Sequence, residues 1–298
     1  MQQSDVLLLG HGTVENLDDL PPFLSNIRRG RPAPPELVHE IRRRYAAIGG
    51  SPLLHISREL ATAVARSTGA HVHLAMRFWH PFARDVLRGL GPLPGRTVRV
   101  IPLAPYSGPV YAGEMMTLAE AARAEGLEPP DLSCAPSWGT EPLLFDGFAD
   151  RLRAALAPLT EAQRRAAHVF FTAHSLPLGV IRQGDPYPAE VRAAAEAVAA
   201  RVALESPWRV VYQSQGATAD PWLGPTVRES LLDIASQGAK DVIFCPIGFL
   251  SDHIEILYDL DIEARAEAER AGLSYRRSES LNASPALVAA ISAVAARL

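Results

Sequence analysis

Acidic side chains recur at a regular spacing in one stretch of the sequence, PIGFLSDHIEILYDLDIE (residues 246–263). Glu255, Asp259 and Glu263 follow one another every four residues. In a helix this spacing advances about 6 Å per step and drifts only about 40° around the axis, so the three carboxylates would line one face. Like charges at this spacing repel by roughly 0.2–0.5 kcal/mol per pair. A helix is therefore not expected to carry this pattern for stability alone unless a cation lies beside this face.

The same stretch also has a purely structural interpretation. Asp252-x-x-Glu255 fits a capping box, in which the first residue caps the helix and the fourth reaches back to it. Acidic residues in a first turn are favoured by the helix dipole. His253 adds a possible soft metal ligand beside Glu255. Spacing alone favours the capping interpretation over metal binding.

A histidine follows a second apolar run. His174 comes directly after HVFFTA (168–173) and before Ser175-Leu176-Pro177, so its imidazole should emerge where a strand ends. An imidazole there can be a base, a metal ligand or a plain loop residue. Ser175 does not indicate a hydrolase, because adjacent residues seldom form a nucleophile–base pair and the sequence has no G-x-S-x-G elbow.

The elements that would position these residues alternate along the whole chain. Apolar runs rich in β-forming residues predict strands at 6–10, 71–76, 99–104, 132–136, 168–173, 209–214, 241–249 and 274–277. Helical periodicity predicts helices near 35–48, 55–68, 80–90, 113–125, 142–157, 188–204, 226–237 and 285–297, besides the acidic stretch. The segment after the first strand is expected to be a loop with prolines. Alternating strands and helices predict parallel sheets covered on both faces.

Two doubly wound sheets fit the 298 residues of the chain. The expected fold is α/β, with two Rossmann-like halves and a cleft between them. We expect an N-terminal half at 1–140, joined by the C-terminal helix at 278–298, and a C-terminal half at 141–277. The last helix is expected to return to the first half because no further strand follows Tyr275 for it to cover.

Ligands of open α/β sheets bind beyond the carboxyl ends of the strands. His11, His174, His253 and Glu255 fall there in the predicted order of elements. No G-x-G-x-x-G follows the first strand and the sequence has no Walker motif, so a nucleotide cofactor is not supported.

Composition narrows the possible partners and location. A net charge of −4 and a pI near 6.1 argue against nucleic acid as the main partner. The first residues, MQQSDVLLLGHGT, do not resemble a signal peptide, and no apolar run approaches the ~20 residues of a membrane span, so we expect a cytoplasmic protein. The two cysteines, Cys134 and Cys245, are too few for a disulfide framework or a four-cysteine iron–sulfur cluster.

Two arginine clusters lie near the N-terminus. The predicted loop SNIRRGRP (25–32) contains Arg28, and the helix beyond it contains Arg44, which precedes Tyr45. Arginines grip carboxylates with paired hydrogen bonds. The loop arginines are the better candidates for an acidic ligand, and a solvated basic face is the favoured interpretation for those on the helix.

Several motifs together resemble one family. TAHSLP and GDPYP, then YQSQGATADPWLGP and PIGFLSDHIEILYDLDIE, are similar to motifs of the ferrochelatases, which insert ferrous iron into a porphyrin. The segments LLLGHGT, SNIRRGRP and RYAAIGGSPL resemble the compact bacterial branch of this family. The resemblance extends from about residue 5 to the end of the chain.

The resemblance implies roles for the residues that match the family motifs. His174 and Glu255 would face each other across the porphyrin and handle the metal and the pyrrole protons. Asp259 and Glu263 would form an acidic ladder that supplies metal, and Asp252 would cap the helix by itself.

The resemblance also implies a binding surface in the first half. Contacts to the porphyrin and its propionates would come from His11, Arg28, Arg44, Tyr45 and Ser51. His11 stands where the compact branch often has tyrosine, which leaves the ligand on that face open.

The implied enzyme is a ferrochelatase, a lyase of haem biosynthesis that takes Fe²⁺ as substrate and contains no iron–sulfur cluster. The porphyrin would be protoporphyrin IX or coproporphyrin III, and the compact form favours the latter. Transient contact with a membrane or a haem-pathway enzyme is a further expectation. One alternative is a chelatase for cobalt or nickel and another tetrapyrrole. Another is a non-catalytic haem or porphyrin carrier, against which Asp259 and Glu263 argue because a carrier needs no acidic ladder.

Overall fold

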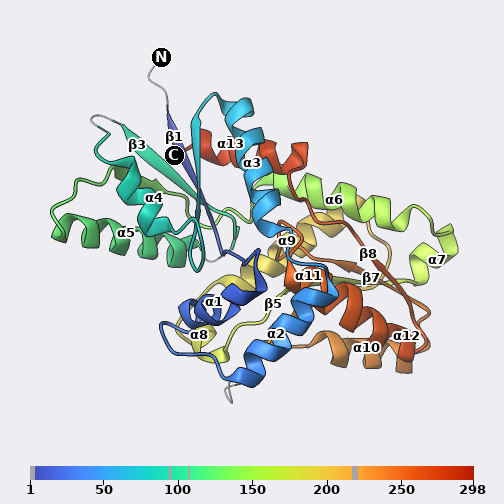
Figure 1. Cartoon of the computed structure of the whole chain (residues 1–298). Helices are drawn as coiled ribbons and strands as arrows, with labels where there is room; N and C mark the ends of the chain where they lie inside the picture. The colour runs from blue at the N-terminus through green and yellow to red at the C-terminus, as the bar shows by residue number, and fades with distance from the viewer. Residues whose placement is uncertain (1–3, 94–95, 107, 217–220) are drawn as a thin grey trace. The chain divides into compact units, whose positions relative to one another are not determined.

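The computed structural model of the chain describes residues 4–93, 96–106, 108–216 and 221–298 (Figure 1). Compactness divides the chain into two units. Unit 1 comprises Met1–Trp138 together with Asn282–Leu298, and unit 2 comprises Gly139–Leu281.

Each unit contains a four-stranded sheet in which every paired strand is parallel to its neighbour. The strand order is β2-β1-β3-β4 in unit 1 and β6-β5-β7-β8 in unit 2. The bounds are β1 (Asp5–Gly10), β2 (His71–Met76), β3 (Thr97–Pro102), β4 (Asp131–Cys134), β5 (His168–His174), β6 (Trp208–Gln213), β7 (Asp241–Cys245) and β8 (Ser274–Arg277). The predicted α/β class with parallel sheets is confirmed.

In the described residues, helices lie between these strands and after the last one. In unit 1 they are η1 (Leu17–Asp19), α1 (Leu20–Ile27), α2 (Pro35–Ala47), α3 (Leu53–Thr68), α4 (Ala83–Leu90), α5 (Gly108–Ala124) and α13 (Pro285–Ala296). In unit 2 they are α6 (Pro142–Leu156), α7 (Glu161–Ala166), α8 (Leu178–Arg182), α9 (Tyr187–Val202), α10 (Val227–Ser236), α11 (Ile254–Leu257), η2 (Asp259–Ala264) and α12 (Arg265–Arg270). Among them, no helix combines the length and apolar character needed to cross a membrane.

One predicted loop is helical. The segment after β1 contains α1, which the two adjacent prolines, Pro21 and Pro22, led us to expect as a loop. They occupy the first turn, where proline costs no hydrogen bond because the first N–H groups of a helix have no partner within it. Arg28 is therefore the C-cap of α1 rather than a residue within a loop.

The switch point of each sheet determines where a ligand site can form. In unit 2 the chain leaves β5 for β6 on one side and then returns to β7 on the other side. The connections after β5 and β7 therefore leave on opposite sides, and the carboxyl ends of these two neighbouring strands are where ligands of open α/β sheets bind. The equivalent point in unit 1 lies between β1 and β3.

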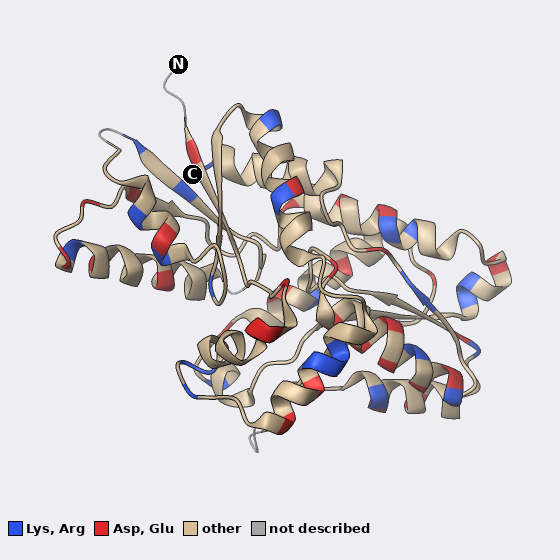
Figure 2. Ribbon diagram, in the orientation of Figure 1, with Lys and Arg blue, Asp and Glu red and all other residues tan. Residues whose placement is uncertain are grey.

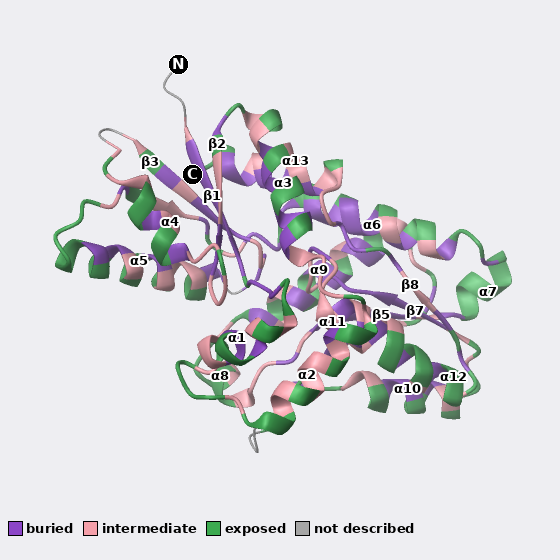
Figure 3. Cartoon of the chain, in the orientation of Figure 1, coloured by how far each residue is buried: buried purple, intermediate pink, exposed green. Residues whose placement is uncertain are grey.

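The core of unit 2 fixes the orientation of the acidic stretch. Ile256, Leu260, Ala264 and Ala268 are at most 2% exposed and pack in one cluster with strand residues such as Phe244 (Figure 3). Burying a leucine or isoleucine side chain contributes about 1.5–3 kcal/mol. Because these buried residues recur every four positions along the chain, the residue directly before each of them points away from the core.

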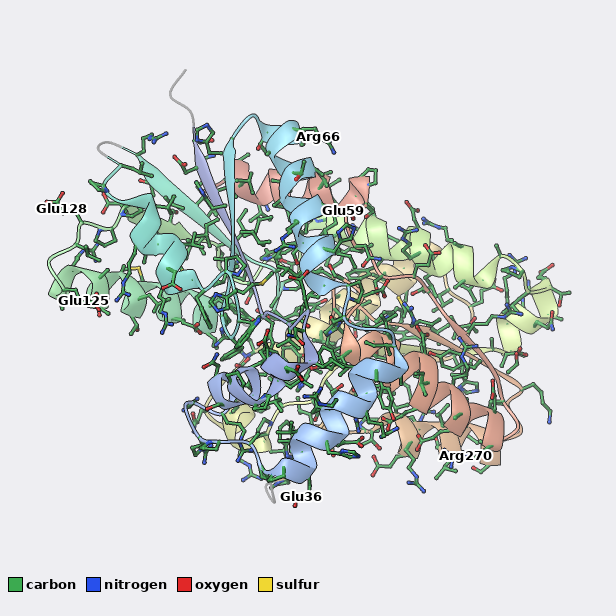
Figure 4. The ribbon with its side chains drawn as sticks, viewed as in Figure 1. Glu36, Glu59, Arg66, Glu125, Glu128 and Arg270 are labelled. Atoms are coloured by element: carbon green, nitrogen blue, oxygen red, sulfur yellow. The ribbon has the colours of Figure 1, made fainter. Side chains whose placement is uncertain are left out.

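Charged residues lie mainly on the helices and loops, with both signs interspersed (Figure 2). Several complement the helix dipoles, as Figure 4 shows for Glu36 in the first turn of α2 and for Arg66 and Arg270 in the last turns of α3 and α12. Such placements stabilise helix ends by about 0.3–1 kcal/mol each.

Candidate active site

His174 is the last residue of β5, at the switch point of the sheet in unit 2. Its Nδ1 atom makes a short hydrogen bond with the carbonyl oxygen of Ser175. A carbonyl oxygen only accepts hydrogen bonds, so Nδ1 carries the proton of the neutral ring. The Nε2 atom is then left with its lone pair, which is the form of imidazole that binds a metal or accepts a proton.

The turn that carries His174 is held by three further hydrogen bonds. The hydroxyl of Tyr187 donates to the carbonyl oxygen of His174 at 3.0 Å. The backbone N–H of Ser175 donates to Gln213 at 2.8 Å, and its hydroxyl donates to Leu223 at 2.9 Å. Tyr187 belongs to the GDPYP segment, so this segment helps to hold the turn at His174.

A glycine lets the chain after β7 approach the end of β5. The N–H of Gly248 donates to the carbonyl oxygen of Thr172 at 2.9 Å. A Cβ atom on Gly248 would lie only 2.6 Å from Cα of Ala173, so no other residue fits without moving the backbone. This close approach brings the segment that leads to Glu255 against the strand that ends at His174.

Glu255 lies in the first turn of α11, next to His174. The distance between His174 Nε2 and Glu255 Oε2 is 3.6 Å, and the two side chains are 35% and 29% exposed. The expectation that they face each other across a porphyrin is wrong. A flat ring between them would need two van der Waals contacts, or roughly 7 Å. They lie side by side and can act on one cation or one proton.

The acidic stretch is not the regular α-helix that the spacing predicted. Residues Asp259–Ala264 form a π-helix, η2, in which the N–H of Glu263 donates to the carbonyl oxygen of Tyr258 at 3.0 Å, five residues earlier. Single π turns within helices are frequent at functional sites. The four-residue spacing does not distinguish an α turn from this wider one.

The acidic residues become more exposed along the stretch. Glu255 and Asp259 are partly buried, whereas Glu263 is exposed. The hydroxyl of Ser214, at the end of β6, donates a short hydrogen bond to Oδ2 of Asp259. Within this unit, the three carboxylates therefore form a series that begins beside His174 and ends at the exposed Glu263.

The predicted capping box is wrong. The N-cap of α11 is His253, whose side chain makes no capping hydrogen bond. Oδ1 of Asp252 instead accepts a hydrogen bond from the hydroxyl of Ser280 at 2.7 Å and lies 3.6 Å from Nη1 of Arg277. Neither Asp252 nor Glu255 caps this helix, so capping does not explain the presence of Glu255.

Arg277 supports a different acidic residue of the stretch. Its Nε and Nη2 atoms donate to the two carboxylate oxygens of Asp261, both at 2.8 Å. Burial alone would lower the pKa of Arg277, but its hydrogen bonds with Asp261 raise it above the usual value. Asp261 therefore has a structural ion pair and does not belong to the series that begins at Glu255.

His253 is part of this site, although the sequence suggested it only as a possible metal ligand. Its ring lies 5.0 Å from that of Phe249, and its Nδ1 atom lies 3.0 Å from the carbonyl oxygen of Ser251. Burial lowers the pKa of His253, although the charge of Glu255 opposes this shift. The ring is therefore neutral at pH 7, because its pKa lies below the usual 6.5.

The site residues predicted in the first half lie in unit 1. His11 follows β1, is exposed, and has its ring centroid 4.7 Å from that of Phe78. Tyr45 is 2% exposed, and its hydroxyl lies 2.9 Å from Oγ1 of Thr13. Ser51 accepts a long hydrogen bond, 3.4 Å, from the N–H of Leu53.

The arginines of unit 1 differ in their surroundings. Nε of Arg28 is buried and has no hydrogen-bond partner among the described residues. Nε of Arg44 donates to Oε1 of Glu40 at 2.8 Å. Hydrogen bonds from Arg43 and Arg44 lower the pKa of Glu40 to about 2, so this carboxylate stays ionised.

No group of three or more His, Cys, Asp or Glu side chains within the described ranges is arranged to hold a metal ion. His174 and Glu255 offer one nitrogen and one oxygen ligand. A nitrogen and an oxygen ligand suit ferrous iron, and both groups can also accept a proton.

Comparison with known proteins confirms the resemblance. The family model named Ferrochelatase matches residues 3–297. A ferrochelatase of Acidobacterium capsulatum is 34% identical over 308 residues, which cover 99% of this chain and 94% of that protein. A ferrochelatase of Herpetosiphon aurantiacus is 36% identical, with 95% of each chain covered. A coproporphyrin III ferrochelatase of Streptomyces griseus is 36% identical and covers 96% of this chain and 83% of that protein.

Solved structures share the fold. SirB from Bacillus subtilis with Fe³⁺ has a TM-score of 0.60 at 12% identity, with 99% of this chain and 95% of that chain covered. CbiX, described as the terminal enzyme of sirohaem biosynthesis in denitrifying bacteria, has a TM-score of 0.53 at 15% identity and covers 98% of both chains.

Proposed function

Because the chain belongs to the ferrochelatase family, we propose that it inserts ferrous iron into a free-base porphyrin in haem biosynthesis, with His174 and Glu255 handling the metal and the pyrrole protons. The observation that carries these two roles is the 3.6 Å distance between His174 Nε2 and Glu255 Oε2. The pair lies at the carboxyl end of β5, beside the switch point at which α/β sheets bind ligands.

The reaction requires a pair of this kind. Ferrous iron replaces the two inner protons of the porphyrin, so one iron porphyrin and two protons are formed and no electron is transferred. Once the iron has passed to the ring nitrogens, Nε2 of His174 and a carboxylate oxygen of Glu255 each accept one of the two protons. The same two atoms ligate iron before the ring nitrogens take it over.

Asp259 and Glu263 supply the metal in this proposal. Their increasing exposure from Glu255 outwards supports the direction of travel, since a hydrated cation meets the exposed carboxylate first. Carboxylates exchange the water ligands of a divalent cation one at a time, which lowers the cost of dehydration at the inner pair.

Unit 1 binds the porphyrin through His11, Arg28, Arg44, Tyr45 and Ser51 in this proposal. The buried Nε of Arg28 supports it, because a buried donor without a partner among the described residues is favoured when a ligand carboxylate satisfies it. Arg44 would have to exchange its hydrogen bond with Glu40 for a propionate. Tyr45 is buried and would act mainly through Thr13.

Coproporphyrin III is the porphyrin that we favour over protoporphyrin IX. The compact form of the chain and its 36% identity to the coproporphyrin III ferrochelatase of Streptomyces griseus support this choice. We also propose a cytoplasmic lyase without an iron–sulfur cluster or a nucleotide, which meets membranes or haem-pathway enzymes only transiently. The cysteine count supports the absence of the cluster, since the chain has only two cysteines.

The test is an anaerobic insertion assay with the purified chain. Free-base coproporphyrin III or protoporphyrin IX is mixed with ferrous iron, and the Soret and Q bands are followed at a porphyrin excess over protein. An enzyme converts many equivalents of porphyrin, whereas a carrier shifts the spectrum of one equivalent and then stops. Parallel reactions with Co²⁺ and Ni²⁺ test the alternative chelatase, which would prefer those metals over iron at equal concentration.

A further inference from the structure

Gln213 is a buried polar residue between the two catalytic groups. It is the last residue of β6 and pairs with His174 in the register of β5 and β6. Its side chain is buried, with the whole residue 5% exposed. Its carbonyl oxygen accepts the 2.8 Å hydrogen bond from the N–H of Ser175, the residue whose own carbonyl oxygen orients the imidazole of His174.

The side chain of Gln213 reaches the other catalytic residue. Its Nε2 atom donates to the backbone carbonyl oxygen of Glu255 at 2.6 Å. One residue therefore makes a backbone bond to the turn of His174 and a side-chain bond to the first turn of α11. The two bonds therefore connect the two segments that carry the imidazole and the carboxylate, whose nearest atoms lie 3.6 Å apart.

The backbone after β6 strengthens this arrangement. Successive side chains of a strand point to opposite faces, so Gln213 and Ser214 would normally diverge. Ser214 has a φ of 58°, in the left-handed region, which breaks the alternation. As a result the side chains of both residues reach the acidic stretch, Gln213 at Glu255 and Ser214 at Asp259.

A role in packing alone does not account for a glutamine at this position. The Oε1 atom of Gln213 is buried and has no hydrogen-bond partner among the described residues. A buried acceptor left in this way is unfavourable, and an apolar side chain such as that of Val211 in the same strand would avoid it. The hydrogen bond from the amide to Glu255 offsets part of this cost.

We propose that Gln213 is a positioning residue that sets the distance between His174 and Glu255. This inference rests on the proposed roles of these two residues. The amide of Gln213 holds the start of α11 at a fixed length from β6, and the carboxylate of Glu255 is thereby kept beside Nε2 of His174.

The test compares Gln213→Met with a matched control. Methionine keeps the length of the side chain and removes the donor, whereas Gln237→Met removes an exposed hydrogen bond to Asp233 of α10. We expect Gln213→Met to lower kcat about tenfold, since small displacements of catalytic groups have effects of this size. The KM for porphyrin should stay within about twofold, and Gln237→Met should match the wild type.

A second comparison separates positioning from stability. Metal affinity is measured with Co²⁺ alone, in the absence of porphyrin, for Gln213→Met in the wild-type chain and in a Glu255→Gln background. If Gln213 acts through Glu255, the substitution weakens binding severalfold in the wild type and changes it less than about twofold in the background. An equal loss in both backgrounds, or a wild-type kcat in Gln213→Met, overturns the proposal.

The controls also keep this inference distinct from the proposed function. If the wild-type chain does not insert iron, or if Glu255→Gln is fully active, the proposed function or the role of Glu255 fails before Gln213 is considered. If Gln213→Met does not fold, Gln213→Leu replaces it, because leucine also has no hydrogen-bond donor and adds no charge beside the site. The same two comparisons then decide.

Discussion

At the scale of residues, the central feature is the imidazole of His174, whose two ring nitrogens have different neighbours. The carbonyl oxygen of Ser175 holds the proton at Nδ1 of His174, and the carboxylate of Glu255 lies 3.6 Å from the other nitrogen. A base with its lone pair aimed at an acid can hold a cation between the two groups or share a proton with the acid.

His174→Ala removes the proposed base and metal ligand. We expect the rate of iron insertion to fall by about 10²–10⁴, the range for loss of a general base, while porphyrin still binds. Insertion is followed by absorbance and porphyrin binding by fluorescence quenching. His55→Ala is the control, because this exposed histidine lies on α3 of unit 1 and pairs only at 3.3 Å with its helix neighbour Glu59 in the contacts described. Retained turnover in His174→Ala would refute the assignment.

Glu255→Gln tests the carboxylate without changing its size. Because Glu255 does not cap α11, we expect the melting temperature to stay within a few degrees of the wild type, roughly the shift of a 1 kcal/mol change. Insertion should fall by at least about tenfold, since the amide neither accepts a proton nor binds iron as a carboxylate does. A full rate with an altered melting temperature would return Glu255 to a structural role.

At the scale of elements, a wide helical turn and one glycine bring the site together. The π-helix η2 keeps Leu260 and Ala264 in the core while Asp259 and Glu263 stay outside it. Gly248 allows the segment after β7 to lie against β5. Both are features of backbone geometry, and each has its own test.

The acidic face is tested by Asp259→Asn combined with Glu263→Gln. If these carboxylates supply metal, the double substitution raises the KM for ferrous iron by about tenfold or more, because two charges that attract the cation are lost. The kcat at saturating iron should change little. Initial rates at varied iron and fixed porphyrin measure both constants. The delivery role is contradicted if the iron dependence is unchanged.

Gly248→Ala tests the close approach of the two segments. The added Cβ would lie 2.6 Å from Cα of Ala173, so the segment after β7 has to shift and Glu255 moves away from His174. We expect loss of stability of about 1–3 kcal/mol, as for an overpacked core, together with lower insertion. Gly89→Ala is the matched control, because its Cβ meets nothing within 4 Å. Equal urea midpoints and rates for both variants would contradict the argument.

Much of the element pattern could be predicted from the sequence, for a physical reason. Strands buried on both faces are continuous apolar runs, so HVFFTA predicted β5 almost to the residue. The helical conformation of the proline-containing segment α1 and the π turn of η2 could not be predicted in the same way. Proline is compatible with both a loop and a first helical turn, and a four-residue spacing fits an α turn and a π turn alike.

The site was less predictable than its elements. The motifs identified His174 and Glu255 as candidate site residues. The sequence does not give the order of strands in a sheet, however, and it is this order that makes β5 and β7 neighbours. The resemblance placed the two residues on opposite sides of a ring, whereas the structure places them side by side. Gln213 lies within the motif YQSQGATADPWLGP, but the motif does not show that its side chain donates a hydrogen bond to a backbone atom of Glu255.

At the scale of the whole molecule, two units repeat one strand order. In each sheet the strands lie side by side in the order second, first, third, fourth, counted along the chain of that unit. The amino-acid sequence itself shows no matching internal repeat. The final helix, α13, packs on α3 and β3 and groups with unit 1. Whether the halves at 1–140 and 141–277 behave as separate domains stays a prediction. The family match over residues 3–297 covers both units.

The most direct test of the account is whether His174 and Glu255 act on one cation as a pair. Co²⁺ binding is titrated for the wild type, His174→Ala, Glu255→Gln and the double variant. We predict that each single substitution weakens Co²⁺ binding and that the double variant binds little more weakly than the weaker single one, because either loss already breaks the shared site. Losses that multiply in the double variant, or single variants that bind as the wild type does, would contradict it.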